Sequence, residues 1–287
     1  MIPSLPDNRW LLRGRSLYLA AFFLFLLLPL SVVAVFAFNN SLFPTPPWKG
    51  FTLDWFVANA GGRTGLLFDS ELLASIWNSC KVAFWVSLIS VLLGTSNAFL
   101  LERAEFRGKG LFTTLMLVPL VIPGVILGIS ILAFASQIAN FLYDSWEIEL
   151  EWLRPGLPLV VMGQVSYIIT IATLTIAARL KRFDTSLEEA ALNLGASRWA
   201  ILRTITLPYL KPAIIGSGAV AFLLSFENFN TTLMLVGSDN PLTILMYGRM
   251  REGASPVLNA VSLALMLVSA LAVVLLYLRK PQQAGDN

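Results

Sequence analysis

Residues 180–212 read LKRFDTSLEEAALNLGASRWAILRTITLPYLKP and join two strongly apolar stretches. Apolar side chains recur at helical spacing in the first half of this connection, which predicts an amphipathic helix. Asp184 or Ser186 is expected to cap its start, and Gly195 can take the positive φ that ends it. A second short helix is expected over residues 197–206. Two short helices hinged at a glycine, lying along a membrane, suit docking to a soluble partner.

Outside this connection the chain is dominated by apolar residues. They make up 56% of the 287 residues, while 13% are charged, about half the share usual in soluble domains. One soluble core cannot hide that much apolar surface. A membrane-spanning helix needs about 20 consecutive apolar residues, so we expect an all-α membrane protein with six transmembrane helices in one domain, residues 16–278. The expected spans are 16–38, 75–101, 111–136, 157–179, 213–236 and 258–278.

The distribution of lysine and arginine predicts the orientation of these spans. Fourteen of the 20 lie at the two termini, in the 102–110 loop and between residues 179 and 211, whereas five lie in the loops of the opposite side. Both termini and the long connection are therefore expected in the cytoplasm, with a cytoplasmic segment at 1–15 and a tail at 279–287. Lys81 remains, inside the second span near its outer end, where its side chain can reach the membrane interface.

The residues needed for several classes of chemistry are missing from the sequence. There is no histidine, and Cys80 is the single cysteine, so we expect no metal site, no cofactor, no catalytic residue and no internal disulfide. The sequence contains no G-x-x-x-x-G-K-[ST] phosphate loop. A net charge of +3 is too small to indicate a nucleic-acid partner. The chain is not expected to be an enzyme.

The long connection resembles the EAA loop of bacterial ABC importer permeases. The family pattern EAA-x3-G-x9-I-x-L-P is matched in type and spacing by Glu189, Ala190, Ala191, Gly195, Ile205, Leu207 and Pro208. In that family the loop inserts into a groove of the ATPase subunit. The resemblance therefore implies that the first four of these residues lie at that joint, with the small alanines allowing a close approach. The alternative is an ordinary amphipathic helix at the membrane interface.

The same resemblance implies a set of partners. They are two ABC ATPase subunits, an extracytoplasmic solute-binding protein and a second homologous permease subunit, with a heterodimer favoured over a homodimer. This chain would be the non-catalytic, multi-pass subunit in the bacterial inner membrane, in contact with lipid, and ATP would be hydrolysed on a separate subunit. A secondary transporter is a further alternative, but such proteins usually carry coupling charges on inverted repeats, and no repeat is visible here.

Other segments resemble the spermidine/putrescine-type branch of these permeases. They are FTLDWF at 51–56, VPLVIPGVILGISIL in the third span, SFENF at 225–229 and PLTILMYGRMREGASPVLNA at 241–260. The resemblance implies a polyamine as the transported solute. Related branches for iron, thiamine or other small solutes share several of these segments, so iron, thiamine, an amino acid or a GABA-like amine remains an alternative cargo.

The fifth span contains an unusual group of polar residues. Glu227 lies about 15 residues from its cytoplasmic end, or about 22 Å into the bilayer, where a carboxylate should face protein or water rather than lipid. Asn230 falls on the same helical stripe, and an aromatic row lies beside it, formed by Phe222, Phe226 and Phe229. A carboxylate beside aromatic rings suits an organic polycation. These residues are expected to line the pathway; alternatively, Glu227 pairs across a subunit interface and only holds helices together.

The third and fourth spans carry further signals. Pro119 and Pro123 are each expected to bend the third helix. Gly124 and Gly128 have the small-xxx-small spacing of close helix contacts. A kinked helix of this kind suits either gating or a fixed fit to its neighbours. Gln164 is a polar residue within the apolar run of the fourth span.

Overall fold

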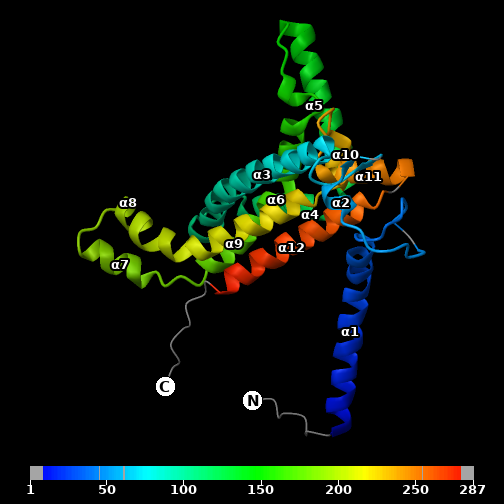
Figure 1. Cartoon of the computed structure of the whole chain (residues 1–287). Helices are drawn as coiled ribbons and strands as arrows, with labels where there is room; N and C mark the ends of the chain where they lie inside the picture. The colour runs from blue at the N-terminus through cyan, green and yellow to red at the C-terminus, as the bar shows by residue number, and fades with distance from the viewer. Residues whose placement is uncertain (1–8, 45, 61, 254, 279–287) are drawn as a thin grey trace. The chain divides into compact units, whose positions relative to one another are not determined.

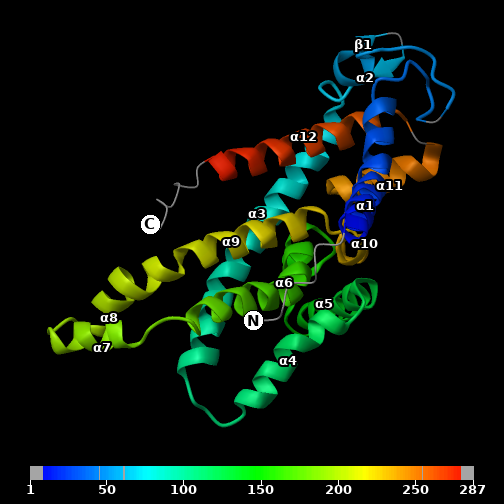
Figure 2. The same ribbon diagram turned by 90° about the horizontal axis from the view of Figure 1, so that it is seen from below.

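A computed structural model describes residues 9–44, 46–60, 62–253 and 255–278. Residues 1–8 of the expected cytoplasmic segment and the expected tail, 279–287, lie outside the described residues. The chain divides into two compact parts (Figures 1 and 2), and each is treated by itself. One part comprises the described residues up to Leu73 together with those from Met246 onward. The other comprises Ala74–Leu245.

The first part combines two apolar helices with a small cap of short helical and strand elements. Its elements are α1 (Arg9–Phe36), α2 (Asp54–Val57), β1 (Asn59–Ala60), β2 (Arg63–Thr64) and α12 (Val257–Leu278). The two strands are antiparallel with Ala60 opposite Arg63, and α1 packs on α12. The Trp55 side chain is buried and its indole Nε1 donates to the Asn39 carbonyl at 2.8 Å. That bond fixes the segment after α1 on the cap.

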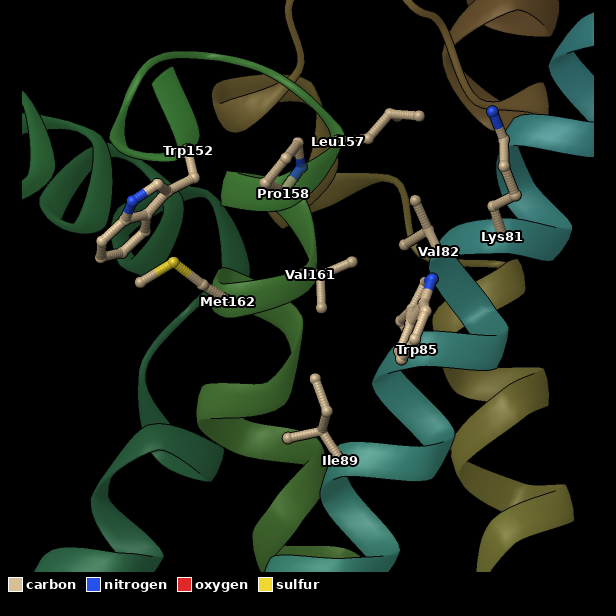
Figure 3. A pocket seen from close by; sticks show the side chains of 9 residues that line it. All are labelled: Lys81, Val82, Trp85, Ile89, Trp152, Leu157, Pro158, Val161 and Met162. Carbon is tan, nitrogen blue, oxygen red and sulfur yellow. The ribbon is translucent and has the colours of Figure 1, made fainter. Parts of the chain in front are cut away.

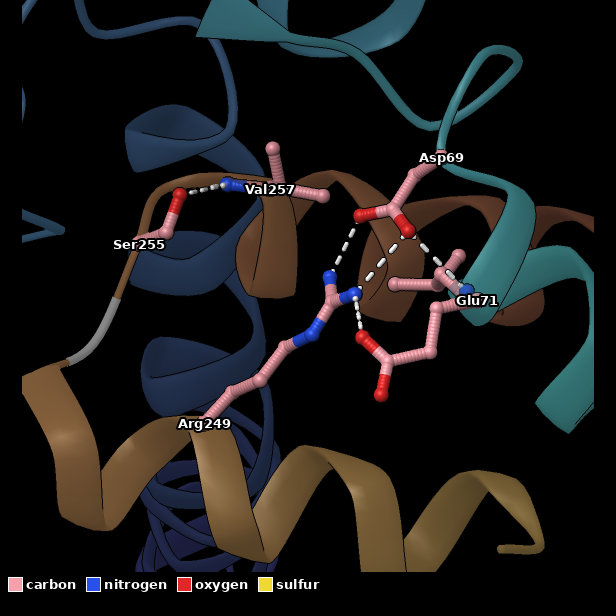
Figure 4. Close-up of polar contacts among 6 residues, drawn as sticks. Asp69, Glu71, Arg249, Ser255 and Val257 are labelled. Carbon is pink, nitrogen blue, oxygen red and sulfur yellow. Dashed lines mark hydrogen bonds and ion pairs between the residues drawn. The ribbon is translucent and has the colours of Figure 1, made fainter. Parts of the chain in front are cut away.

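An ion-pair cluster joins the start of α3 (Ser70–Arg103) to α11 (Leu242–Gly253) in this first part (Figure 4). Two guanidinium nitrogens of Arg249 donate to the two carboxylate oxygens of Asp69, and Nη2 also donates to Glu71 at 2.7 Å. Asp69 also accepts from the Leu72 backbone N–H at 3.0 Å. The hydrogen bond from Arg249 is the main reason that the pKa of Asp69 is lowered. The fork is therefore a bidentate, charge-assisted contact.

The second part is a bundle around α6 (Leu157–Leu180). About half of α6 is buried, a larger share than in the four other helices of the described residues that are long and apolar enough to span a membrane. It packs against α9 and α10 on one side and α4 on another. Its inward side chains include Leu159, Ile168 and Ile176. The remaining elements are α4 (Lys109–Val121), α5 (Gly124–Trp146), η1 (Glu151–Leu153), α7 (Ser186–Asn193), α8 (Arg198–Ile201), η2 (Leu202–Thr206), α9 (Leu207–Phe226) and α10 (Asn230–Leu235).

The structure agrees with the expected all-α membrane class but divides the spans differently. Five helices in the described residues are long and apolar enough to cross a membrane, and two shorter apolar helices, Lys109–Val121 and Val257–Leu271, accompany them. Six spans with both termini in the cytoplasm therefore stay a prediction. The expected continuous third span, 111–136, is wrong because the helix ends at Val121 and restarts at Gly124.

Proline chemistry explains this break. Ile122 has φ −74° and ψ 129°, an extended conformation, because the ring of Pro123 disfavours helical geometry at the preceding residue. Pro119 behaves otherwise and stays inside α4. A bend was expected at both prolines. The helix is instead fully interrupted before Pro123 and continues through Pro119.

Two further expectations need correction at α9. The fifth span, 213–236, is also interrupted, because α9 ends at Phe226 and α10 starts at Asn230. The second short helix, 197–206, is not a separate element: helix runs without interruption from Arg198 to Phe226. Its π-helical turn, Leu202–Thr206, ends two residues before Pro208, whose missing N–H would otherwise leave a gap in the α-helical ladder.

Candidate functional site

The connection between α6 and α9 folds as a helical hairpin that extends from the ends of these helices (Figures 1 and 2). Its turn is a Schellman motif: Ala196 N–H donates to the Ala191 carbonyl at 3.0 Å, and Gly195 N–H to the Leu192 carbonyl at 2.9 Å. Gly195 has φ +85°, which confirms the positive φ expected there. The Ser197 hydroxyl then accepts from Ala200 N–H at 3.2 Å and caps α8.

The start of α7 is capped differently from the expectation. Its N-cap residue is Thr185, which makes no side-chain cap bond. Asp184 instead accepts from the Ser186 backbone N–H at 3.0 Å. Hydrogen bonding to Ser186, through its side chain first and its backbone second, lowers the pKa of Asp184. Both residues that were expected to cap the helix thus take part in one local turn.

The outer face of the hairpin is apolar and exposed. Leu194 is 89% exposed and Trp199 is 68% exposed, although large apolar side chains normally avoid water. Glu189 and Ala190 lie exposed on the same hairpin, and Ala191 is half-buried. Exposed large apolar side chains together with a carboxylate on one projecting hairpin suit a docking surface.

The inner face of the hairpin is held by Glu188, which the sequence did not single out. Glu188 accepts from the Thr206 hydroxyl at 2.7 Å, and Arg103 at the end of α3 pairs with its carboxylate at 3.3 Å. The Arg103 guanidinium also lies 5.5 Å from the centroid of the buried Phe183 ring, which packs edge-on against Tyr209. These contacts tie the hairpin to α3 and α9, and no sequence spacing relates residue 103 to residue 188.

The three remaining residues of the loop pattern lie where the hairpin enters α9. Ile205 packs on a buried cluster that includes Ile176 and Leu210. Leu207 is half-buried and Pro208 is exposed. Ile205 thus packs the base of the hairpin against the bundle, and a contact of these three residues with an ATPase stays a prediction.

A second feature of this part of the chain is a cavity of about 320 Å³ at the breaks in the third and fifth spans. The segment between α4 and α5 forms one wall, and the segment between α9 and α10 forms another. Its polar lining comes from Tyr167, Asn228, Asn230 and Thr231. The two interruptions thus open onto one space, which is lined by hydrogen-bonding groups and by apolar groups such as Leu120 and Ile171.

Gln164 holds the two halves of the broken fifth span together. It is 1% exposed; its carbonyl accepts from the Ser225 hydroxyl in α9, and its amide donates to the Thr232 hydroxyl in α10 at 2.9 Å. Asn228 lies between the halves, accepts from Thr232 and donates to the Tyr167 hydroxyl at 2.7 Å. The break is therefore a satisfied polar network, as buried polar groups require.

Three glycines allow α10 to approach its neighbours closely. A Cβ built on Gly124 would lie 3.1 Å from the Asn230 Cβ, and one on Gly128 would lie 2.9 Å from the Met234 Cβ. A Cβ on Gly163 of α6 would nearly overlap the Leu235 side chain, at 2.2 Å. The close contact expected of Gly124 and Gly128 is therefore confirmed, and both glycines contact α10.

The residues expected to line the pathway separate in the structure. Asn230 borders the cavity, while Glu227 is exposed directly after the last residue of α9. Phe222 and Phe226 stack at 6.1 Å, but Phe222 borders a different groove, beside Trp77 of α3. Because α9 ends at Phe226 and α10 starts at Asn230, the expected helical stripe through Glu227 and Asn230 does not form.

Comparison with known proteins identifies the family. Residues 87–280 match the family described as "Binding-protein-dependent transport system inner membrane component". The chain belongs to this family. It is a permease subunit of an ABC importer, a class that works with a binding protein and ATPase subunits.

Several relatives resemble the chain over most of its length. The Escherichia coli (strain K12) spermidine/putrescine transport system permease protein PotC is 29% identical over 92% of both chains. The putrescine transport system permease protein PotI of the same organism is 30% identical, covering 88% of this chain and 84% of PotI. The molybdenum transport system permease protein ModB of that organism is 32% identical over 72% of this chain and 93% of its own.

A solved structure shares the fold. A bacterial alginate ABC transporter, crystallised with an alginate pentasaccharide-bound periplasmic protein, has a chain that superposes with a TM-score of 0.74 over 96% of both chains at 20% identity. At that identity the likeness establishes the fold and leaves the cargo open.

Proposed function

We propose that this chain is one half of the membrane pathway of a polyamine importer, with the α7–α8 hairpin as its contact to an ATPase. In this proposal a second homologous permease, different in sequence, completes the pathway. A binding protein delivers the solute from outside, and two separate subunits hydrolyse ATP. In this proposal the chain crosses the membrane six times with both termini in the cytoplasm, and the hairpin therefore lies on the ATPase side.

The hairpin geometry is the observation that carries this proposal. The exposed face around Leu194 and Trp199 offers apolar area and the Glu189 carboxylate to a partner, while Glu188 and Arg103 fix the opposite face to the bundle. The hairpin exposes one surface to a partner and is attached to α3 and α9 by the other. A displacement of the partner can therefore be transmitted to these two helices. Gly195 keeps the turn between the two helices tight.

A binding experiment tests the docking surface. Leu194→Ser should reduce recovery of the ATPase with the solubilised permease, because central apolar contacts dominate most interfaces. Leu67→Ser is the matched control, since Leu67 is an exposed leucine outside the hairpin. Equal ATPase recovery from both variants would show that the hairpin is not the docking surface.

The polyamine cargo rests on different support. PotC and PotI, whose names state spermidine and putrescine transport, match the chain over most of its length. The exposed Glu227 carboxylate and the nearby hydrogen-bonding cavity suit a solute that carries ammonium groups.

Substrate-dependent ATPase activity of the reconstituted complex with its binding protein tests this cargo. Stimulation by spermidine or putrescine alone supports the proposal. Stimulation by molybdate, iron, thiamine, an amino acid or GABA instead refutes the polyamine cargo and keeps the importer. ModB makes molybdate a necessary member of the panel.

A further inference from the structure

A groove between α3 and α6, separate from the cavity at the helix breaks, carries no part of the proposed transport function (Figure 3). Its volume is about 470 Å³. One wall comes from α3, the other from the first turns of α6, and Trp152 of η1 closes the side of α6. The lining residues are Lys81, Val82, Trp85, Ile89, Trp152, Leu157, Pro158, Val161 and Met162.

The groove is polar at one end and apolar along the rest. Lys81 supplies the charged group of the lining, and the indole N–H groups of two tryptophans are the other side-chain donors. In Figure 3 the Lys81 ammonium and the Trp85 indole nitrogen lie toward the end at which α3 and α6 begin, whereas Ile89 lies at the opposite end. This polarity matches an amphiphile with one small headgroup.

Lys81 adds a positive charge to the otherwise apolar lining of the groove. It lies 11 residues after the first residue of α3, about 16 Å along the helix. It is exposed, and among the residues that the structure describes it forms no hydrogen bond or ion pair. A lysine can extend its ammonium toward the membrane interface, but an unpaired charge within a span remains costly. A negative group at this end of the groove would neutralise it.

We propose that this groove binds one phospholipid with an anionic headgroup. One acyl chain lies along Val82, Val161 and Ile89, and the phosphate accepts from the Lys81 ammonium and the Trp85 indole. Basic pockets between membrane helices bind anionic headgroups, and the Lys81 ammonium beside this apolar groove supplies the same electrostatic attraction. The α1 helix of a second copy fits less well, because Arg9–Phe36 contains no acidic residue and would leave the ammonium unneutralised.

Native mass spectrometry of the assembled complex tests the lipid site, with phosphatidylglycerol and phosphatidylcholine of identical acyl chains as probes. The wild-type complex should prefer phosphatidylglycerol by about fivefold, the contribution of one lysine near a membrane surface. Lys81→Gln should reduce this ratio to about 1. Lys49→Gln, which removes an exposed lysine outside the groove, should leave it unchanged. An unaltered ratio in Lys81→Gln overturns the proposal.

A second variant separates the chain-binding part of the groove from its charge. Met162→Trp should fill the groove and reduce binding of both lipids, because Met162 is a half-exposed lining residue whose replacement leaves the buried core unchanged. A photo-crosslinker in place of Met162 should capture phospholipid. Capture of a neighbouring permease helix instead, or unchanged lipid binding by Met162→Trp, refutes the site.

Discussion

Replacing Arg103 by glutamine removes the ion pair that connects α3 to the hairpin and leaves the loop pattern itself untouched. The two charged groups are 3.3 Å apart, and their side chains are 29% and 25% exposed. A pair that is partly shielded from water in this way contributes about 1 kcal/mol, near the upper end for exposed pairs. Glu188→Ala is expected to cost about 2 kcal/mol, because it also takes the carboxylate acceptor from the buried Thr206 hydroxyl.

The assay is the number of ATP molecules hydrolysed per solute transported in proteoliposomes. A loss of about 1 kcal/mol in the hairpin's attachment corresponds to about a fivefold shift between attached and detached hairpins. Arg103→Gln should therefore raise the ATP cost per solute severalfold while basal ATPase activity persists. Arg182→Gln is the matched control, since Arg182 is an exposed arginine at the start of the same connection.

A double-mutant cycle decides whether the two residues act as a pair. The effects of Arg103→Gln and Glu188→Gln should not be additive, because either change breaks the same contact. Additive effects, or a transport stoichiometry unchanged in both single variants, would refute the role of this contact in coupling.

Three other expectations concern Gly195, Glu227 and Asp69. Gly195→Pro should uncouple ATP hydrolysis from transport while the protein still inserts, because proline cannot adopt the φ of +85° found there; Gly195→Asn, which tolerates that φ, should retain more coupled uptake. Glu227→Gln should impair uptake of cationic solutes selectively, and an equal loss for neutral solutes would favour a packing role. Because Arg249 lowers the pKa of Asp69, the pair stabilises the fold above the unfolded carboxyl pKa of about 3.9 and loses this contribution as pH falls through the lower folded value. Thermal unfolding of the detergent-purified protein should show this acid sensitivity reduced in Asp69→Asn, and identical acid profiles would contradict it.

The hairpin was predictable because its determinants are local. The spacing of Gly195 and of the apolar residues before it specifies a helix, a positive-φ turn and a second helical start without reference to the rest of the chain. Pro123 likewise predicts an irregularity in the third span, although a proline alone does not show whether the helix bends or is fully interrupted. The local sequence thus predicts where the hairpin turn and the irregular helix lie, and the structure shows their conformations.

The break in the fifth span was not predictable for the opposite reason. Residues 227–229 contain neither proline nor glycine, and the break depends on Gln164, more than 60 residues away, which bonds to both helix halves. A contact of that kind leaves no periodic signal. The pathway residues were therefore placed on a helical stripe that does not exist, and the contact between Arg103 and Glu188 was missed for the same reason.

The uninterrupted helix from Arg198 to Phe226 has a mechanical consequence. Its 29 residues make a rod about 43 Å long, with the hairpin at one end and the break beside the cavity at the other. A tilt of about 5° about the hairpin end would move the far end by nearly 4 Å, by the geometry of a rod of this length. That displacement is comparable to the distance between two packed atoms. Because α10 packs closely against Gly124, Gly128 and Gly163, the Gln164 bridge between α9 and α10 would have to take up this displacement. Under the proposed function, a small rotation at the hairpin would in this way change the width of the cavity.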